Sequence, residues 1–99
     1  MPLEIFVSRR AAREIECVVQ WWASNRPAAP GAVRQDLQAS LNLLLMQPDI
    51  GVRVKEASLP DVRRLHLDRI RYWVYYRVRR NRLEILSVWH SSRGTDPAV

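Results

Sequence analysis

The residues best suited to chemistry lie in one stretch of the chain, between Val62 and Arg93. Arginine and histidine are interleaved there with tryptophan and tyrosine. Guanidinium groups pair with phosphate or carboxylate groups and stack on aromatic rings. A histidine such as His66 or His90 titrates near neutral pH and could transfer a proton. This stretch could therefore bind an anionic partner, or assist the cleavage of a phosphodiester bond.

The composition is that of one small folded domain, which we place at residues 1–99. A hydrophobic fraction of 47% argues against disorder, although 26% of the residues are charged. The net charge is +6, and every cation except Lys55 is an arginine. This excess favours a nucleic acid, an acidic protein or both as partners.

Several classes of protein are excluded by what the chain lacks. Cys17 is the only cysteine, so neither an intramolecular disulfide nor an all-cysteine metal site can form. With only two histidines besides, we expect no metal and no cofactor. The apolar run Leu43–Met46 is too short for a membrane span, and the N-terminus lacks the pattern of a signal peptide. We therefore expect a cytoplasmic protein with no membrane partner.

The first half of the chain predicts a strand followed by two helices. Leu3–Val7 is a short apolar run, and Ser8 after it can cap a helix. Apolar residues then recur at helical spacing until about Asn25, because Pro27 disfavours helical geometry in the residue before it. A second apolar stripe predicts another helix, with Pro30 in its first turn.

This second helix ends at Pro48, inside a proline-glycine turn over residues 47–51. Residues 52–60 show no period, so we treat them as a connector. Trp21 and Trp22 of the first helix are expected to pack between the helices and the sheet, although Trp21 lies off the main stripe and could instead cover a partner-binding patch.

The second half of the chain alternates with a period of two, which predicts three antiparallel strands. Two of them lie between Val62 and Val78, and the third runs from Leu83 to Trp89. Asp68-Arg69 and Arg80-Asn81 occupy the turns, Asn81 being tolerant of left-handed geometry. Residues 94–99 are expected to fray.

The predicted fold class is α+β: an N-terminal strand, a helical hairpin and a three-stranded antiparallel meander, with the helices packed on one sheet face. We expect that face to carry Leu65, Leu67, Tyr72, Val74, Tyr76 and Val78. We expect the other to carry Arg64, His66, Trp73, Tyr75 and Arg77. This second face is open and positively charged unless another element, such as the connector, covers Trp73 and Tyr75.

This order of elements resembles the RelE/ParE toxins of bacterial type II toxin–antitoxin pairs. The resemblance covers nearly the whole chain and is specific through the order and spacing of its motifs together. These are Pro48-Asp49-Ile50-Gly51, Val62-Arg63-Arg64-Leu65, Tyr75-Tyr76-Arg77-Val78 and the ending Ile85 to Arg93. It implies a RelE/ParE-like fold and a toxin that inhibits growth.

The RelE-like branch consists of ribosome-dependent endoribonucleases that cut messenger RNA. Matched to that branch, Arg64 and His66 fall where it has a pair of lysines, and Arg93 falls at or near a transition-state arginine. A nuclease reading would therefore use Arg64, His66, His90 and Arg93 as the catalytic set.

Two departures favour the other branch. Trp73 stands where the nucleases carry another arginine, and no tyrosine follows Arg93 to act as acid or base. ParE-like members have the same fold but poison DNA gyrase by binding it, without cutting anything themselves. We therefore favour a non-enzymatic gyrase poison over a nuclease.

The expected target-binding residues are Arg63, Arg64, Trp73, Tyr75, Arg77 and Arg93. The resemblance also implies a cognate antitoxin, whose acidic and apolar peptide would wrap the toxin in a hetero-oligomer. DNA gyrase is the expected target, with the ribosome and messenger RNA as the alternative. A third possibility is a non-toxic RNA-binding module that stacks bases on the sheet.

Overall fold

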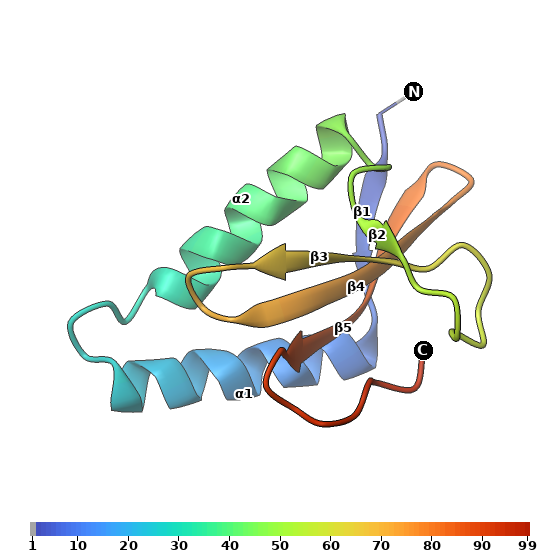
Figure 1. The fold of residues 1–99 in the computed structure, drawn as a ribbon. Coiled ribbons are helices and arrows are strands. Elements are labelled where there is room, and N and C mark those ends of the chain that lie inside the picture. The colour runs from blue at the N-terminus through green and yellow to red at the C-terminus, as the bar shows by residue number, and fades with distance from the viewer. Residues whose placement is uncertain (1) are drawn as a thin grey trace.

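The computed structural model describes residues 2–99 as two helices and a five-stranded mixed sheet (Figure 1). The elements are β1 (Glu4–Val7), α1 (Arg9–Asn25), α2 (Ala32–Met46), β2 (Val52–Arg53), β3 (Arg63–Leu67), β4 (Tyr72–Arg79) and β5 (Arg82–His90). The strand order is β1-β5-β4-β3-β2, with β1 parallel to β5 and every other neighbour antiparallel. The predicted α+β meander is confirmed and is extended by one strand at each edge.

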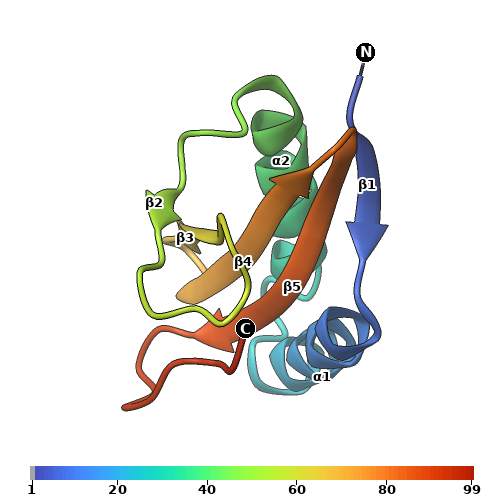
Figure 2. The ribbon, with the colours of Figure 1, turned by 90° about the vertical axis from the view of Figure 1, so that its right-hand side faces the viewer.

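Both helices lie on one side of the sheet (Figures 1 and 2). Their buried side chains, such as Val18 and Leu37, form one cluster with Val74, Tyr76 and Ile85 of the sheet. Apolar area removed from water in this layer is the main source of stability. Neither helix in residues 2–99 is long and apolar enough to cross a membrane.

The ends of the helices follow local signals in the sequence. Ser8 caps α1 as expected, because its Oγ accepts a hydrogen bond from the Ala11 backbone N–H at 3.0 Å. The helix ends at Asn25, before Pro27. The second helix begins at Ala32, so Pro30 lies in the preceding turn and not in the first helical turn as expected.

The two meander turns differ in length from each other. Residues 68–71 connect β3 to β4 as a four-residue loop, in which Arg71 has a φ of 61°. Arg80 and Asn81 form the two-residue turn between β4 and β5, but the left-handed residue is Arg80, with a φ of 59°, and not Asn81. Both turns therefore hold an arginine in a backbone conformation that L-residues rarely adopt.

The connector and the tail are more ordered than the sequence indicated. Val52 and Arg53 pair with β3 as a short edge strand. The expectation that residues 94–99 fray was wrong, because Pro97 is buried and the Val99 backbone oxygen accepts hydrogen bonds from Ser58. Most of the contacts that order this segment come from residues distant in the sequence, such as Arg10 and Ser58, so the local composition could not predict it.

The outer edge of β1 has no neighbouring strand in residues 2–99. Its apolar side chains Ile5, Phe6 and Val7 are all exposed. Arg82 stacks over Phe6, with its Cζ 4.3 Å from the ring centroid. An unpaired apolar strand edge of this kind can accept a further strand.

The proline-glycine turn is held by Tyr76 of the core. The Tyr76 hydroxyl donates to the Pro48 carbonyl at 2.7 Å and accepts the Gly51 N–H at 2.9 Å. A Cβ on Gly51 would lie 2.7 Å from Cε1 and 2.9 Å from Cζ of that ring. Glycine is therefore required here by the close approach of a buried ring, since no glycine among residues 2–99 has a positive φ.

Replacing Tyr76 with Phe should lower the unfolding free energy by about 1–3 kcal/mol, because it leaves a buried N–H and a carbonyl without their partner. Burial raises the pKa of Tyr76 above its ordinary value. The neutral phenol is thus favoured in the folded state, and its contribution to stability is complete below about pH 10 and is lost as pH rises through the folded pKa. Urea unfolding at neutral and alkaline pH should show a smaller alkaline loss in Tyr76→Phe than in the wild type. An identical alkaline loss in both proteins would contradict this account.

Candidate partner-binding face and its strap

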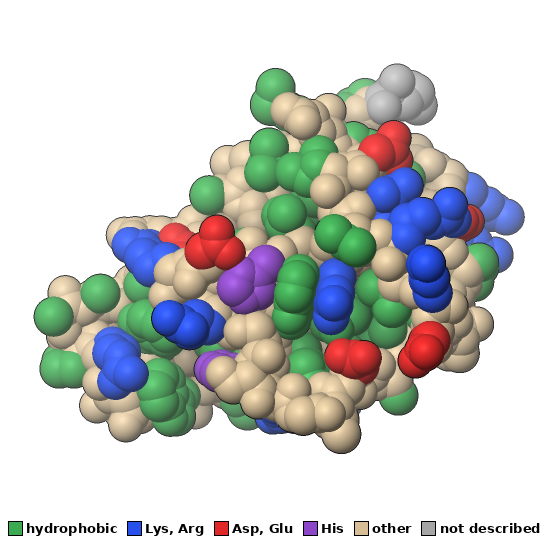
Figure 3. All heavy atoms as spheres, in the orientation of Figure 1, with side chains coloured by type: hydrophobic (Ala, Val, Ile, Leu, Met, Phe, Trp, Pro, Cys, Tyr) green, Lys and Arg blue, Asp and Glu red, His purple; other side chains and the backbone are tan. Residues whose placement is uncertain are grey.

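The sheet face turned away from the helices, called here the distal face, carries a row of stacked side chains. Cross-strand pairing sets Arg64 opposite Tyr75 and His66 opposite Trp73. The Arg64 Cζ lies 4.0 Å from the centroid of the Trp73 ring, and the His66 ring centroid lies 4.6 Å from it on tilted planes. Figure 3 shows a histidine, a hydrophobic side chain and a cationic side chain side by side in the middle of the face. The three side chains of this row, His66–Trp73–Arg64, are all half-exposed.

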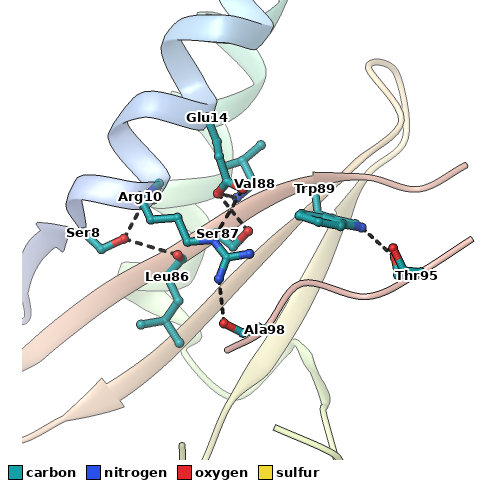
Figure 4. Close-up of polar contacts among 10 residues, drawn as sticks. Ser8, Arg10, Glu14, Leu86, Ser87, Val88, Trp89, Thr95 and Ala98 are labelled. Atoms are coloured by element: carbon teal, nitrogen blue, oxygen red, sulfur yellow. Dashed lines mark hydrogen bonds and ion pairs between the residues drawn. The ribbon is translucent and has the colours of Figure 1, made fainter. Parts of the chain in front are cut away.

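Residues 94–99, called here the strap, cross the distal face and make polar contacts with α1, β3, β5 and the connector. Trp89 donates its Nε1–H to the Thr95 carbonyl at 2.7 Å, and Arg10 of α1 donates to the Ala98 carbonyl at 2.6 Å (Figure 4). Asp96 lies 3.9 Å from the Arg64 guanidinium. Beyond it, the strap meets the connector between β2 and β3 at Ser58.

The strap and the connector together bury a second, smaller apolar layer. Tyr75 is only 1% exposed and Val62 only 2%, and both lie outside the main core cluster. The Tyr75 hydroxyl accepts a hydrogen bond from Arg64 at 3.1 Å. The expectation that Tyr75 is available on an open face was therefore wrong. Its ring is interior, because loop and tail supply the cover that the sheet itself lacks.

Arg77 was also expected on an open face and is instead 9% exposed. Its Nε donates to Glu84 Oε1 at 2.6 Å, across the β4–β5 pair that sets these two residues opposite each other. A guanidinium taken out of water needs such a carboxylate, since a buried charge without a partner is costly. Arg77 is thus occupied by an internal ion pair.

Of the two other arginines predicted to bind the target, one makes internal hydrogen bonds and the other is exposed. Arg63 points toward the proline-glycine turn and donates to the carbonyls of Asp49 and Gly51 at 3.0 and 2.8 Å. Arg93 is exposed and stacks over Trp89, with its Cζ 4.2 Å from the ring centroid. Arg93 therefore stays accessible to a partner, whereas Arg63 is occupied in holding the turn.

The four residues of the nuclease reading do not converge. His66 stacks on Trp73, whereas His90 packs against Tyr72 in an edge-to-face contact with centroids 4.9 Å apart. Because Tyr72 and Trp73 are consecutive in β4, their side chains point to opposite faces of the sheet. The two histidines therefore lie on opposite faces, and no substrate atom could contact both.

Hydrogen bonds also limit what each histidine can do. His66 Nδ1 lies 2.6 Å from Asp68 Oδ1, and His90 Nδ1 accepts the Ser92 backbone N–H at 3.0 Å. In residues 2–99, no three His, Cys, Asp or Glu side chains come together as a metal site would require.

The side chain that fixes α1 beside this face, Glu14, was not among the predicted site residues. Glu14 accepts hydrogen bonds from Ser87 Oγ at 2.9 Å and from the Val88 backbone N–H at 3.1 Å, and Ser8 donates to the Leu86 carbonyl at 3.2 Å (Figure 4). Glu14 lies three residues after Ala11 and four before Val18, which are both buried, so its spacing places it on the covered side of the helix. A glutamate at such a position is a usable signal for a hydrogen-bonding role, because acidic side chains are rarely covered without a partner.

Replacing Glu84 with Gln should lower the unfolding free energy by about 2 kcal/mol, because Arg77 then keeps its buried charge without a carboxylate. Glu56→Gln is the matched control, since Glu56 is exposed, and its effect should be near zero. Denaturant unfolding of both variants measures the difference. Equal stabilities would show that the Arg77–Glu84 pair does not hold the hairpin.

Deleting residues 95–99 should uncover the distal face. Trp89 would lose its acceptor and Tyr75 its cover, so acrylamide quenching should increase and the unfolding free energy should fall by roughly 2 kcal/mol. The same deletion in a Trp89→Phe background is the control, and there the gain in quenching should largely disappear. Unchanged quenching in the first deletion would mean that the strap does not cover this face.

Comparisons with known proteins agree with the fold. A family model described as the ParE toxin of the type II toxin–antitoxin system, parDE, matches residues 5–94. A solved structure described as the chromosomal ParDE TA system from P. aeruginosa superimposes with a TM-score of 0.71 at 20% sequence identity, over 89% of this chain and 95% of that chain. At that identity the likeness establishes the fold alone. None of the curated proteins compared with the chain matches it.

Proposed function

The chain belongs to the ParE toxin family of type II toxin–antitoxin systems, and on that basis we propose that it inhibits growth by poisoning DNA gyrase. We further propose that a cognate antitoxin neutralises it in a hetero-oligomeric complex. The toxin acts by binding and holding its target, without a covalent step of its own.

The half-exposed row on the distal face is the observation that carries this proposal. Trp73 is held between a guanidinium and an imidazole, so its ring is already ordered before any partner arrives. Ordered aromatic and arginine side chains lose little conformational entropy on binding, and they dominate the energetics of protein interfaces. A surface of this kind is suited to a protein target.

The same row argues against cleavage of RNA. A nuclease needs one group to remove a proton and another to donate one at the same phosphate. His66 and His90 lie on opposite faces of the sheet, and Trp73 fills the space between Arg64 and His66. Binding without cleavage is the function that these positions support.

The antitoxin is expected to carry acidic and apolar side chains. The net charge of +6 would attract an acidic peptide, and the exposed apolar edge of β1 offers backbone groups to an added strand. An extended segment of the antitoxin would therefore gain both hydrogen bonds and apolar contacts along Ile5 to Val7.

Expression of the chain should arrest growth, and purified protein should inhibit supercoiling by gyrase and increase the amount of cleaved DNA. Trp73→Ala should weaken this inhibition by about tenfold, because the ring is the central contact of the row. Met46→Ala, which removes a side chain of a residue that is 81% exposed elsewhere on the surface, should leave it unchanged.

A ribosome-dependent cleavage assay separates the two toxin branches. The proposal fails if the protein cuts messenger RNA in translating ribosomes and leaves gyrase unaffected. The circular dichroism spectrum of Trp73→Ala should match that of the wild type, which would show that a loss of inhibition does not come from unfolding.

A further inference from the structure

A concave site lies away from the distal face and is lined by the end of α1, the β3–β4 loop and the end of β5. Figure 1 shows where these three segments lie in the fold. This site, called here the aromatic cleft, has a volume of about 720 Å³. Its walls include Trp21 and Trp22 of α1, Tyr72 of β4 and His90 of β5. Pockets that hold small ligands span roughly 300–1,000 Å³, so the cleft is large enough for one.

The cleft is strongly cationic. Arg26, Arg69, Arg71 and Arg93 line it, and none of its lining residues within the described chain is acidic. Arg69 is already paired with Asp36 at 2.6 Å. The other three guanidiniums have no carboxylate partner among residues 2–99. An anionic group bound here would contact several guanidinium groups, and no lining carboxylate would repel it.

An aromatic surface adjoins these cations. Trp21 is 47% exposed and meets Trp22 edge-to-face with centroids 6.0 Å apart. Arg26 lies over Trp21, its Cζ 5.3 Å from the ring centroid. The Trp22 Nε1–H is buried and donates to nothing in the described chain. That buried N–H is out of reach of a ligand, so the cleft offers the accessible ring face of Trp21 beside its guanidinium groups.

The position of Arg71 is maintained at a conformational cost. Its φ is 61°, in the left-handed region that is favourable for glycine and tolerated by asparagine but costly for arginine. Its carbonyl accepts hydrogen bonds from both the N–H and the Oγ of Ser91, each at 3.0 Å. These bonds fix the loop against the end of β5, so the Arg71 side chain is presented at the cleft. Strained residues of this kind are common at ligand sites.

We propose that the aromatic cleft binds a nucleotide unit, with the phosphate on Arg71 and Arg93 and the base stacked on Trp21. Cations beside an exposed indole match a ligand that joins a negative charge to a flat ring. An acidic peptide would use the guanidiniums but would leave the ring faces unused, which favours the nucleotide. The unit could come from a free nucleotide or from a nucleic-acid strand, and both present the same chemistry.

This inference does not rest on gyrase as the target. It concerns a surface that shares only Arg93 with the predicted target-binding residues, and it can be measured with the isolated protein. If the gyrase assay fails, the proposed nucleotide site is unaffected. If no nucleotide binds, the proposed action on gyrase is unaffected.

A matched pair of substitutions tests the phosphate contact. Arg71→Gly and Arg80→Gly each remove one positive charge and relieve one left-handed arginine, at the tips of different hairpins. Only Arg71 lines the cleft. Binding of a labelled short single-stranded DNA, followed by fluorescence anisotropy, should weaken about tenfold in Arg71→Gly and stay near wild type in Arg80→Gly. The slope of log affinity against log salt should fall by about 0.7 in Arg71→Gly alone.

The base contact is tested with Trp21→Ala and an abasic strand of the same length. Wild-type protein should bind the normal strand roughly tenfold more tightly than the abasic one, and Trp21→Ala should remove that difference. Calorimetric titration with adenosine monophosphate shows whether the bound unit is a free nucleotide or part of a nucleic-acid strand. Binding that depends on Arg71 and Trp21 assigns a free nucleotide, whereas binding of the strand alone assigns a nucleic acid, and either result supports the cleft as a nucleotide site.

Three results would overturn the inference. One is equal weakening in Arg71→Gly and Arg80→Gly, which would mean nonspecific attraction by net charge. Another is wild-type protein that binds neither the strand nor the mononucleotide, or binds the abasic strand as tightly as the normal one. The third is an oligoglutamate peptide that competes as well as the strand, which would assign the cleft to an acidic protein.

Discussion

The outer edge of β5 imposes the constraint on which the rest of the molecule depends. β1 pairs with β5 only as far as Ile85, so the backbone groups farther along the strand need other partners. Ser8 and Glu14 of the first helix supply them at Leu86 and Val88. An unpaired buried backbone group would cost free energy comparable to a lost hydrogen bond, and these two side chains remove that cost. The helix is thereby held beside the strand over its first two turns.

Both proposed binding surfaces depend on where this helix lies. Near its start, Arg10 reaches the strap at Ala98, and near its end Trp21 and Trp22 form one wall of the aromatic cleft. Arg93 links the two surfaces, because it stacks on Trp89 beside the strap and also lines the cleft. A shift of α1 along β5 would therefore alter the cover of the distal face and the shape of the cleft together.

Most of the local structure was readable from the sequence, because short-range rules decide it. The Ser8 cap, the helix that ends before Pro27 and the period of two from Val62 onward all gave the observed elements. The Arg77–Glu84 pair also had a usable signal. A two-residue turn at Arg80-Asn81 fixes the register and sets those residues opposite each other.

The remaining features depend on contacts between distant segments, and no periodicity reports these. The strap touches Arg10, Ser58 and Arg64, which are far from it in the chain. Leu86 is an extra residue in β5, because Tyr75 pairs with Ser87 and Tyr76 with Ile85. This bulge changes the alternation of β5, so alternation alone could not assign every side chain of the strand to a face. Burial of Tyr75 and Arg77 followed from tertiary cover that composition does not encode.

The bare edge of β1 has a consequence for the protein in concentrated solution. Two copies could join edge to edge along Ile5, Phe6 and Val7, as unprotected strands tend to do. Mutual repulsion between molecules that each carry a charge of +6 opposes such self-association. That repulsion extends over only about 8 Å at physiological ionic strength, and added salt weakens it further. The apolar contacts along the β1 edge are not screened in this way. Added salt should therefore favour edge-to-edge association of the isolated chain.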